Sequence, residues 1–346
     1  FTSESMQSPP LELFKVNLDT GRGTPVGRGA NSGTIDWITD GKGAILVRED
    51  FSEKRQEHSI RAFASRNDRV IFSSKGAALG ISLVGVSSKG DRLIVGDEGD
   101  ADFFSLREMT LADGEVKGAI LQRENAEVQG VLADSNRVVH GVRFSGMYPS
   151  YEMFDADLHR DIKAVVNRFT SYAVFIDSWS ADWSKVLLLV EGGAKASRYV
   201  VFDRSAKTLK EVSYARPSIK EEDVGEVVTI EFKARDGLKI NGLITWPTGI
   251  PADQRKNLPF IVMPHGGPAA YDAVGFDWLA QFLANEGYAI IQPNFRGSAG
   301  FGAGFREAGY GEWGRKMQND VTDAANAVVR MGWADPARMC IVGASY

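Results

Sequence analysis

The feature that most constrains the fold is a pair of turn series that recur through residues 1–215. The first series contains Asp19-Thr20-Gly21, Asn67-Asp68, Asp113-Gly114, His159-Arg160-Asp161 and Arg204-Ser205-Ala206, and the second contains Asp40-Gly41, Lys89-Gly90, Asp134-Ser135-Asn136 and Asp182-Trp183-Ser184. Successive members of each series lie about 45 to 49 residues apart, which is the period range of propeller blades. The stretches around the turns, for example 81–86 and 186–190, are short and apolar, which indicates strands.

Two interleaved hairpin series with one period mean four short strands in each unit, which is the make-up of a β-propeller blade. Because a single blade cannot bury both of its faces, neighbouring blades must stack. Residues 1–220 are therefore expected to form four propeller blades and parts of a fifth, without a helix before residue 215 and with further blades upstream. One or two β-sandwiches would also give regular strands, but the shared period favours the propeller.

The pattern changes near residue 220. Residues 216–226 are polar and include Pro217, which predicts an exposed linker. Strands are then expected at 227–232, 238–246, 260–263, 288–292 and 339–342, and helices at 276–286, with an apolar side of Trp278, Leu279, Phe282 and Leu283, and at 320–331. This alternation predicts that residues 221–346 are the N-terminal part of an α/β-hydrolase domain, with a mostly parallel sheet covered on both faces.

Composition excludes several classes of protein. The net charge of −5 argues against a nucleic-acid binder, and no apolar run approaches the roughly 18 residues needed to cross a bilayer. The single cysteine, Cys340, rules out an intrachain disulfide and a thiolate metal cluster, and is expected to be buried in a strand. The chain begins with Phe1 and shows no signal-peptide pattern, so sequence upstream is expected to be missing, and a cytoplasmic or periplasmic location fits equally well.

Two short motifs indicate chemistry. Gly343-Ala344-Ser345-Tyr346 follows an apolar run and supplies four of the five positions of G-x-S-x-G, the strained turn that presents the nucleophile of α/β-hydrolases. His265-Gly266-Gly267-Pro268 follows an expected strand, where hydrolases place a loop whose backbone N–H reaches the developing oxyanion. Ser345 is therefore the predicted nucleophile, and the N–H of Tyr346 is a predicted oxyanion donor.

Between these motifs lie N-x-R-G-S-x-G-x-G at residues 294–302, G-x-W-G at 311–314 and D-V-x-D at 320–323. In this order the motifs resemble the prolyl oligopeptidase family of serine peptidases, nearest to its acylaminoacyl-peptidase-like branch, over residues 224–346. That family also carries a propeller. The resemblance implies that Ser345 forms an acyl-enzyme, that the amides of Gly267 and Tyr346 hold the oxyanion, and that the propeller admits only short peptides. It implies no metal and no organic cofactor.

Some residues have competing interpretations. In this fold the triad runs Ser, Asp or Glu, then His along the chain, so His265 is interpreted, with Gly266, as shaping the loop rather than as the base. The base and its acidic partner are then expected beyond Tyr346, and the chain is expected to be an inactive fragment. Arg296 is interpreted as a structural ion-pair partner. Asp320 and Asp323 are interpreted as charges at a helix N-terminus, and residues 297–304 as a mobile or tightly turned loop.

Short peptides are the expected partners, whereas neither nucleic acid nor a membrane is expected, and a homo-oligomer is left open. Two other functions also remain open: an esterase of the same fold, and a non-catalytic propeller that binds other molecules. The sequence does not decide between exopeptidase and endopeptidase activity. It also does not decide which substrate side chain is preferred at the position that precedes the cleaved bond.

Overall fold

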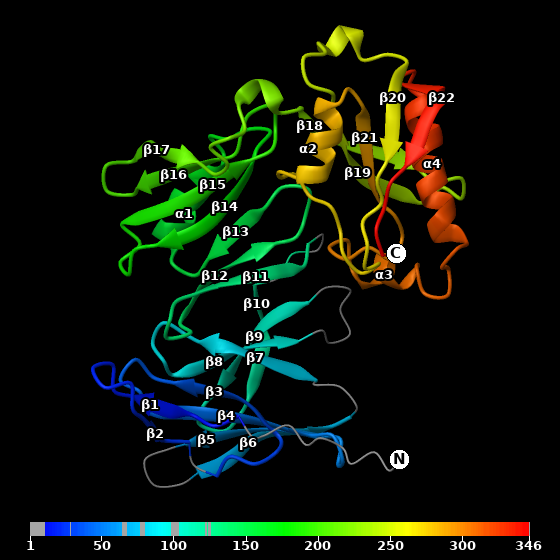
Figure 1. Cartoon of the computed structure of the whole chain (residues 1–346). Helices are drawn as coiled ribbons and strands as arrows, with labels where there is room; N and C mark the ends of the chain where they lie inside the picture. The colour runs from blue at the N-terminus through cyan, green and yellow to red at the C-terminus, as the bar shows by residue number, and fades with distance from the viewer. Residues whose placement is uncertain are drawn as a thin grey trace. The chain divides into compact units, whose positions relative to one another are not determined.

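The computed structural model describes residues 11–27, 29–63, 68–76, 80–97, 104–121, 123 and 126–345 (Figure 1). The chain divides into two compact units, the first made of Phe1–Gln122 and Gly130–Val142 and the second of Arg123–Gln129 and Arg143–Tyr346. The second unit therefore contains all of the predicted α/β segment together with the antiparallel strands that directly precede it. The domain boundary near residue 220 stays a prediction.

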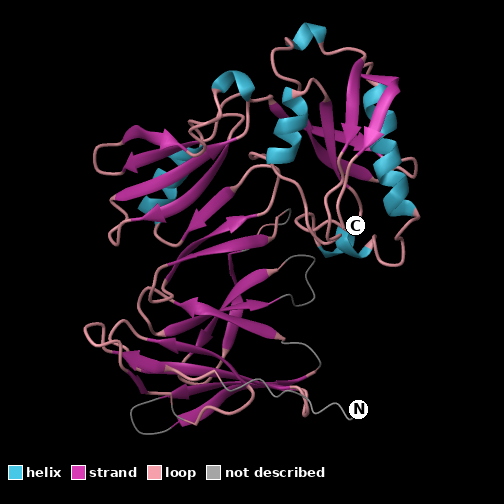
Figure 2. Ribbon diagram, in the orientation of Figure 1, coloured by secondary structure: helices cyan, strands magenta, loops and turns pink. Residues whose placement is uncertain are grey.

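Up to residue 214, the described strands form antiparallel sheets in hairpin order (Figure 2). The strands are β1 (Phe14–Val16), β2 (Gly23–Pro25), β3 (Thr34–Thr39), β4 (Ile45–Ser52), β5 (Glu57–Phe63), β6 (Asp68–Lys75), β7 (Ile81–Val86), β8 (Arg92–Asp97), β9 (Ser105–Thr110), β10 (Val116–Leu121), β11 (Val128–Ala133), β12 (Val139–Phe144), β13 (Ser150–Met153), β14 (Ala173–Trp179), β15 (Lys185–Glu191), β16 (Arg198–Asp203) and β17 (Thr208–Tyr214). β1 pairs with β2, and the longer sheets are β3-β4-β5-β6, β7-β8-β9-β10, β11-β12-β13 and β14-β15-β16-β17. Three of these sheets thus have the four strands expected of a blade.

In the first unit, neighbouring sheets share a core and polar ties. Ile60 of the β3–β6 sheet and Leu93 of the β7–β10 sheet belong to one buried apolar cluster. Arg137, at the turn between β11 and β12, donates to the carbonyl oxygen of Val84 at 3.0 Å and lies 2.6 Å from the carboxylate of Asp36. The β3–β6 and β7–β10 sheets therefore bury apolar surface against each other, as repeated units must.

A helix stands where the repeat predicts only turns and strands. α1 (Ala156–Val166) begins after Asp155, whose carboxylate accepts the N–H of Leu158 at 2.7 Å as an N-cap. Leu158, Ile162 and Val165 are buried at the spacing of a helix face. The prediction of no helix before residue 215 is wrong, and so is the turn at 159–161, which lies within α1. The helical spacing of the apolar residues, rather than the polar residues between them, decides the local structure.

Beyond residue 226 the described strands form one sheet in the order β18-β19-β21-β20-β22. Their bounds are β18 (Val227–Lys233), β19 (Lys239–Thr245), β20 (Leu258–Val262), β21 (Ala289–Asn294) and β22 (Ala334–Ile341). The β18–β19 and β19–β21 pairs are antiparallel, whereas the β20–β21 and β20–β22 pairs are parallel. The sheet is therefore mixed rather than mostly parallel, because the β18–β19 hairpin joins it through β19 in the antiparallel sense.

Helices cover both faces of this sheet (Figure 1). They are α2 (Trp278–Asn285), α3 (Ala303–Glu307) and α4 (Lys316–Arg330), and short 3-10 turns occur at Glu221–Asp223 and Ala252–Gln254. Ala324 of α4 packs with Phe260 on one face, whereas Ala280 of α2 packs with Ile261 on the other. Successive strand residues point to opposite faces, so β20 supplies both cores.

Two expectations about burial need correction. Cys340 is exposed, because β22 lies at the edge of the described sheet and pairs with β20 alone. The expected apolar side of α2 does not pack as a whole: Trp278 is 71% exposed and Phe282 is 57% exposed. The helix turns Ala280 and Ala284 toward the sheet instead.

Candidate active site

The last described residues place Ser345 at a strained turn. β22 ends at Ile341, and the chain then reaches Ser345, which is exposed and has a φ of 68°. Residues other than glycine rarely adopt this left-handed region, and such strain is concentrated at functional sites. A serine at positive φ just after a strand agrees with the turn that the G-x-S-x-G motif predicts.

The glycine loop after β20 passes directly beside Ser345. A Cβ built on Gly266 would lie 3.3 Å from the Cβ of Ser345, 3.9 Å from its Oγ and 3.0 Å from the carbonyl oxygen of Ala344. Gly267 has a φ of 127°, which also favours glycine. Two motifs far apart in sequence therefore meet, and only a residue without a side chain fits at Gly266 without displacing the serine. The second predicted oxyanion donor, Tyr346, lies outside the described residues.

His265 is engaged through both ring nitrogens. Its Nδ1 lies 2.9 Å from the carbonyl oxygen of Gly266, and its Nε2 lies 2.9 Å from the Oγ of Ser298. The ring stacks on Phe295 with the centroids 4.6 Å apart. Burial lowers the pKa of His265, which favours a neutral ring, and Nδ1 donates to the carbonyl oxygen of Gly266. These contacts tie the imidazole to its own loop and to the next one, in keeping with a loop-shaping role.

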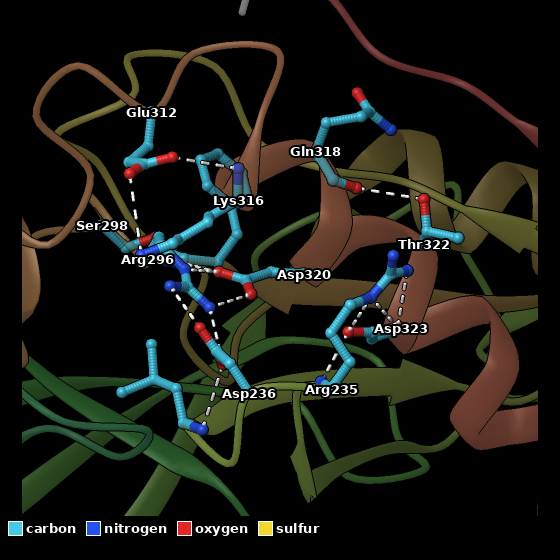
Figure 3. A network of polar contacts seen from close by, with 12 residues as sticks. Arg235, Asp236, Arg296, Ser298, Glu312, Lys316, Gln318, Asp320, Thr322 and Asp323 are labelled. Atoms are coloured by element: carbon cyan, nitrogen blue, oxygen red, sulfur yellow. Dashed lines mark hydrogen bonds and ion pairs between the residues drawn. The ribbon is translucent and has the colours of Figure 1, made fainter.

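Arg296 lies at the centre of a buried ion-pair network (Figure 3). Its Nε and Nη2 donate to the two carboxylate oxygens of Asp320, each at 2.7 Å, and its backbone N–H donates to the same carboxylate at 2.9 Å. Its Nη1 lies 2.8 Å from the carboxylate of Asp236. The side chains of Arg296 and Asp320 are 6% and 0% exposed. The hydrogen bonds that Arg296 donates to Asp320, and then those that it donates to Asp236, raise the pKa of Arg296, so the guanidinium stays charged.

Asp320 and Asp323 are not charges at the start of a helix, as their spacing predicted. α4 begins at Lys316, so both carboxylates lie at least one turn inside it. Asp323 accepts the backbone N–H of Arg235 at 2.7 Å and its Nη2 at 2.9 Å. Figure 3 shows both carboxylates facing arginines. The prediction fails because the partners of the two carboxylates, Arg296 and Arg235, come from distant segments of the chain. Asp236, the other partner of Arg296, could be recognised in the sequence only as part of a turn.

The glycine-rich segment 297–304 is tightly turned. Gly297, Gly300 and Gly302 have φ values of 96°, 81° and 95°, and α3 begins at the next residue. The N–H of Ala299 donates to the carbonyl oxygen of Ala270 at 3.1 Å. Together with the bond between His265 and Ser298, this contact joins the segment to the loop beside Ser345 at two points.

Comparison with known proteins gives the family. The prolyl oligopeptidase family matches over residues 274–346. Dipeptidyl aminopeptidase BIII of Pseudoxanthomonas mexicana is 30% identical over 268 residues, which is 76% of this chain and 38% of the relative. Residues 274–346 thus carry the pattern of the prolyl oligopeptidase family. The resemblance expected from the motifs is thereby confirmed. The acylamino-acid-releasing enzyme of Sus scrofa is 29% identical over 110 residues, which is 32% of this chain and 15% of that enzyme.

The fold also matches a solved hydrolase. The crystal structure of puromycin hydrolase superimposes with a TM-score of 0.64 at 17% identity, covering 94% of this chain and 51% of that one. At this identity the likeness shows the fold alone. The chain thus spans about half of the solved protein and 38% of dipeptidyl aminopeptidase BIII.

The described ranges contain neither a candidate metal cluster nor a candidate membrane-spanning helix. Their His, Cys, Asp and Glu side chains form no group of three or more that could hold a metal ion. No helix in the same ranges is both long enough and apolar enough to span a membrane.

The loop between the glycine motif and α2 carries a half-buried acid, Asp272. The Oδ2 of Asp272 is buried and has no hydrogen-bond partner among the described residues. Asp272 lines a cavity of about 280 Å³ together with Asp277, Gln292 and Glu191, and Glu191 is paired with Arg216 at 3.0 Å. Burial, and then the nearby charge of Asp277, raise the pKa of Asp272 to about 7.

We expect Asp272→Asn to stabilise the protein clearly more at pH 8.5 than at pH 5. The folded state holds the Asp272 proton up to about pH 7, whereas the unfolded chain has the ordinary pKa of 3.8. Native stability therefore falls as the pH rises from about 4 to above 7. At 1.36 kcal/mol per pKa unit, the neutral amide should recover roughly 2 to 4 kcal/mol at the higher pH.

Urea unfolding at the two pH values measures this difference. The exposed variant Asp253→Asn is the matched control and should behave alike at both. An equal effect of Asp272→Asn on the free energy of unfolding at pH 5 and pH 8.5 would contradict the raised pKa of Asp272 in the folded state.

Proposed function

We propose that the complete protein is a serine peptidase that cleaves short peptides through an acyl-enzyme on Ser345. The observation that carries this proposal is the contact between Gly266 and Ser345, which brings a glycine loop beside the hydroxyl of a residue held at positive φ. The match of residues 274–346 to the prolyl oligopeptidase family, and the similarity to a dipeptidyl aminopeptidase, support peptide-bond chemistry at this position.

In the proposed mechanism the Oγ of Ser345 attacks the scissile carbonyl carbon while its proton passes to a base. The negative oxygen of the tetrahedral intermediate accepts hydrogen bonds from the amides of Gly267 and Tyr346, each worth about 3 to 4 kcal/mol in the transition state. The leaving amine takes the proton, and water then hydrolyses the acyl-enzyme.

The general base is proposed to come from sequence beyond residue 346. Three of the four histidines, His58, His140 and His159, belong to the first 220 residues, and His265 is bound within its own loop. A base and its acidic partner located after the nucleophile match the order of the triad in α/β-hydrolases. On this proposal residues 1–346 alone are inactive.

The proposed substrates are short peptides recognised near their amino end. One relative is named a dipeptidyl aminopeptidase and another an acylamino-acid-releasing enzyme. Both names describe action near the start of a peptide, with a free amino group in the first case and an acylated one in the second.

We expect the complete protein to hydrolyse Ala-Ala-p-nitroanilide, which has a free amino end, or N-acetyl-Ala-p-nitroanilide, whose amino end is acylated. The substrate that is hydrolysed faster identifies which kind of amino end the protein prefers. Release of p-nitroaniline measures turnover, and p-nitrophenyl acetate is assayed in parallel. Turnover of the ester without either anilide would favour an esterase. No turnover, together with no labelling of Ser345 by a fluorophosphonate, would favour a non-catalytic binding module.

A further inference from the structure

The glycine-rich segment beside the site is held by two side chains from the ends of neighbouring antiparallel strands of the same compact unit. The Oγ of Ser145, which directly follows β12, donates to the carbonyl oxygen of Gly300 at 3.0 Å. The Oε1 of Glu127, which directly precedes β11, accepts the N–H of Gly302 at 3.0 Å. The two contacts lie on either side of Phe301, so they fix both the position and the direction of the turn.

Ser145 and Glu127 also bind each other. The N–H of Glu127 donates to the Oγ of Ser145 at 2.9 Å, and the N–H of Ser145 donates to the carbonyl oxygen of Glu127 at 2.8 Å. Since a hydroxyl has one proton and the Oγ already accepts from Glu127, the proton of Ser145 is directed at Gly300. Ser145 is 5% exposed, so water does not compete for this bond.

The same strand ends contact the loop that follows the His-Gly-Gly motif. Burial raises the pKa of Tyr271, whereas the backbone of Gly146 and the side chain of Gln129, which lie near its hydroxyl, lower it. A Cβ on Gly300 would lie 2.8 Å from the ring of Tyr271, and this ring meets Phe301 edge-on with the centroids 5.7 Å apart. The packing against Tyr271 therefore leaves no room for a side chain at position 300.

From this turn, the connection to Ser345 takes two steps. The bond between Ala299 and Ala270 and the bond between Ser298 and His265 join the turn to the segment that contains Gly266. Gly266 in turn contacts Ser345. A shift of about 1 Å in a group that positions reacting atoms can cost about 100-fold in rate, so the placement of this turn has consequences at the serine.

We propose that Glu127 and Ser145 are positioning residues for the oxyanion loop. They hold Gly300 and Gly302 in place and, through them, the backbone of residues 265–270. This inference rests on the proposed peptidase function. On this inference, residues at the ends of the antiparallel strands β11 and β12 influence kcat, in addition to any influence of these strands on substrate access.

The test uses single variants of the complete protein with the better of the two anilides. Ser145→Ala and Glu127→Ala should each lower kcat about 10- to 100-fold, with KM changed by less than about twofold. Glu127→Gln keeps an oxygen that accepts from Gly302, and Ser145→Thr keeps the hydroxyl, so both should retain most of the turnover. The rate of Ser345 labelling by a fluorophosphonate should fall in the alanine variants as kcat does.

Ser197→Ala is the matched control. Ser197 is 2% exposed, and its Oγ has no hydrogen-bond partner in the described part of the chain, so its loss should leave kcat unchanged. Unchanged kcat in Ser145→Ala and Glu127→Ala, or an equal loss in Ser197→Ala, would overturn the positioning role. Undiminished turnover in Ser345→Ala would instead overturn the proposed function, so the two failures are distinguishable.

Discussion

Replacement of Ser345 by alanine should abolish peptide hydrolysis by the complete protein, lowering kcat by about 10⁴- to 10⁶-fold. In the proposed mechanism the hydroxyl oxygen forms the new bond to the substrate carbon, and the strained backbone at φ 68° holds it beside Gly266. Removal of this one atom leaves substrate binding and the oxyanion hole, which account for only the residual rate. The measurement is p-nitroaniline release together with covalent labelling by a fluorophosphonate.

The exposed serine Ser213 on β17 provides the control for this variant. Ser213→Ala should keep full turnover and full labelling. If Ser345→Ala turned over substrate within tenfold of the unmodified protein, another nucleophile would be responsible and the proposed mechanism would be wrong.

Removal of the Asp320 carboxylate should cost about 3 to 5 kcal/mol of the free energy of unfolding. Asp320→Ala leaves the guanidinium of Arg296, which is 6% exposed, without the partner that binds it through two side-chain bonds. Asp236 remains, but it is 40% exposed and contacts the outer nitrogens alone. Urea unfolding followed by tryptophan fluorescence measures the loss, since Trp246 is buried in the same core as α4.

An exposed ion pair on the same sheet gives the comparison. Asp335 binds Arg338 at 2.7 Å, but these side chains are 28% and 55% exposed, so Asp335→Ala should cost less than about 1 kcal/mol. The double variant Arg296→Met with Asp320→Leu should recover most of the stability lost in Asp320→Ala, because it leaves no unpaired buried charge. Equal losses in Asp320→Ala and Asp335→Ala would show that burial does not strengthen the Arg296 pair.

The candidate site was recognisable from sequence where its geometry depends on local backbone chemistry. Ser345 and the Gly266-Gly267 pair belong to short motifs whose glycines mark positive φ or close backbone approach, and such requirements are visible in a few consecutive residues. The contact between Gly266 and Ser345 could be expected only because each motif follows an apolar strand, and parallel strands bring their carboxyl ends to one edge of a sheet.

The residues around the site were not recognisable in the same way. The partner of Arg296 was predicted to exist but not identified, and Asp320 was assigned to a helix end that lies four residues earlier in the structure. Glu127 and Ser145 carry no motif at all. Each makes its contact with a residue more than 150 positions away, and no local spacing encodes such a pair.

The sequence by itself determined the repeating hairpins, the change to alternating strands and helices near residue 220, and the two motifs that meet at Ser345. These features follow from local rules: turn chemistry, strand alternation and the conformations open to glycine. Tertiary structure alone decided the antiparallel insertion of β19, the exposure of Cys340 and the partners of Asp320, Glu127 and Ser145. The physical reason is that burial and ion pairing depend on what lies across space from a residue, and chain topology rather than neighbouring sequence sets that.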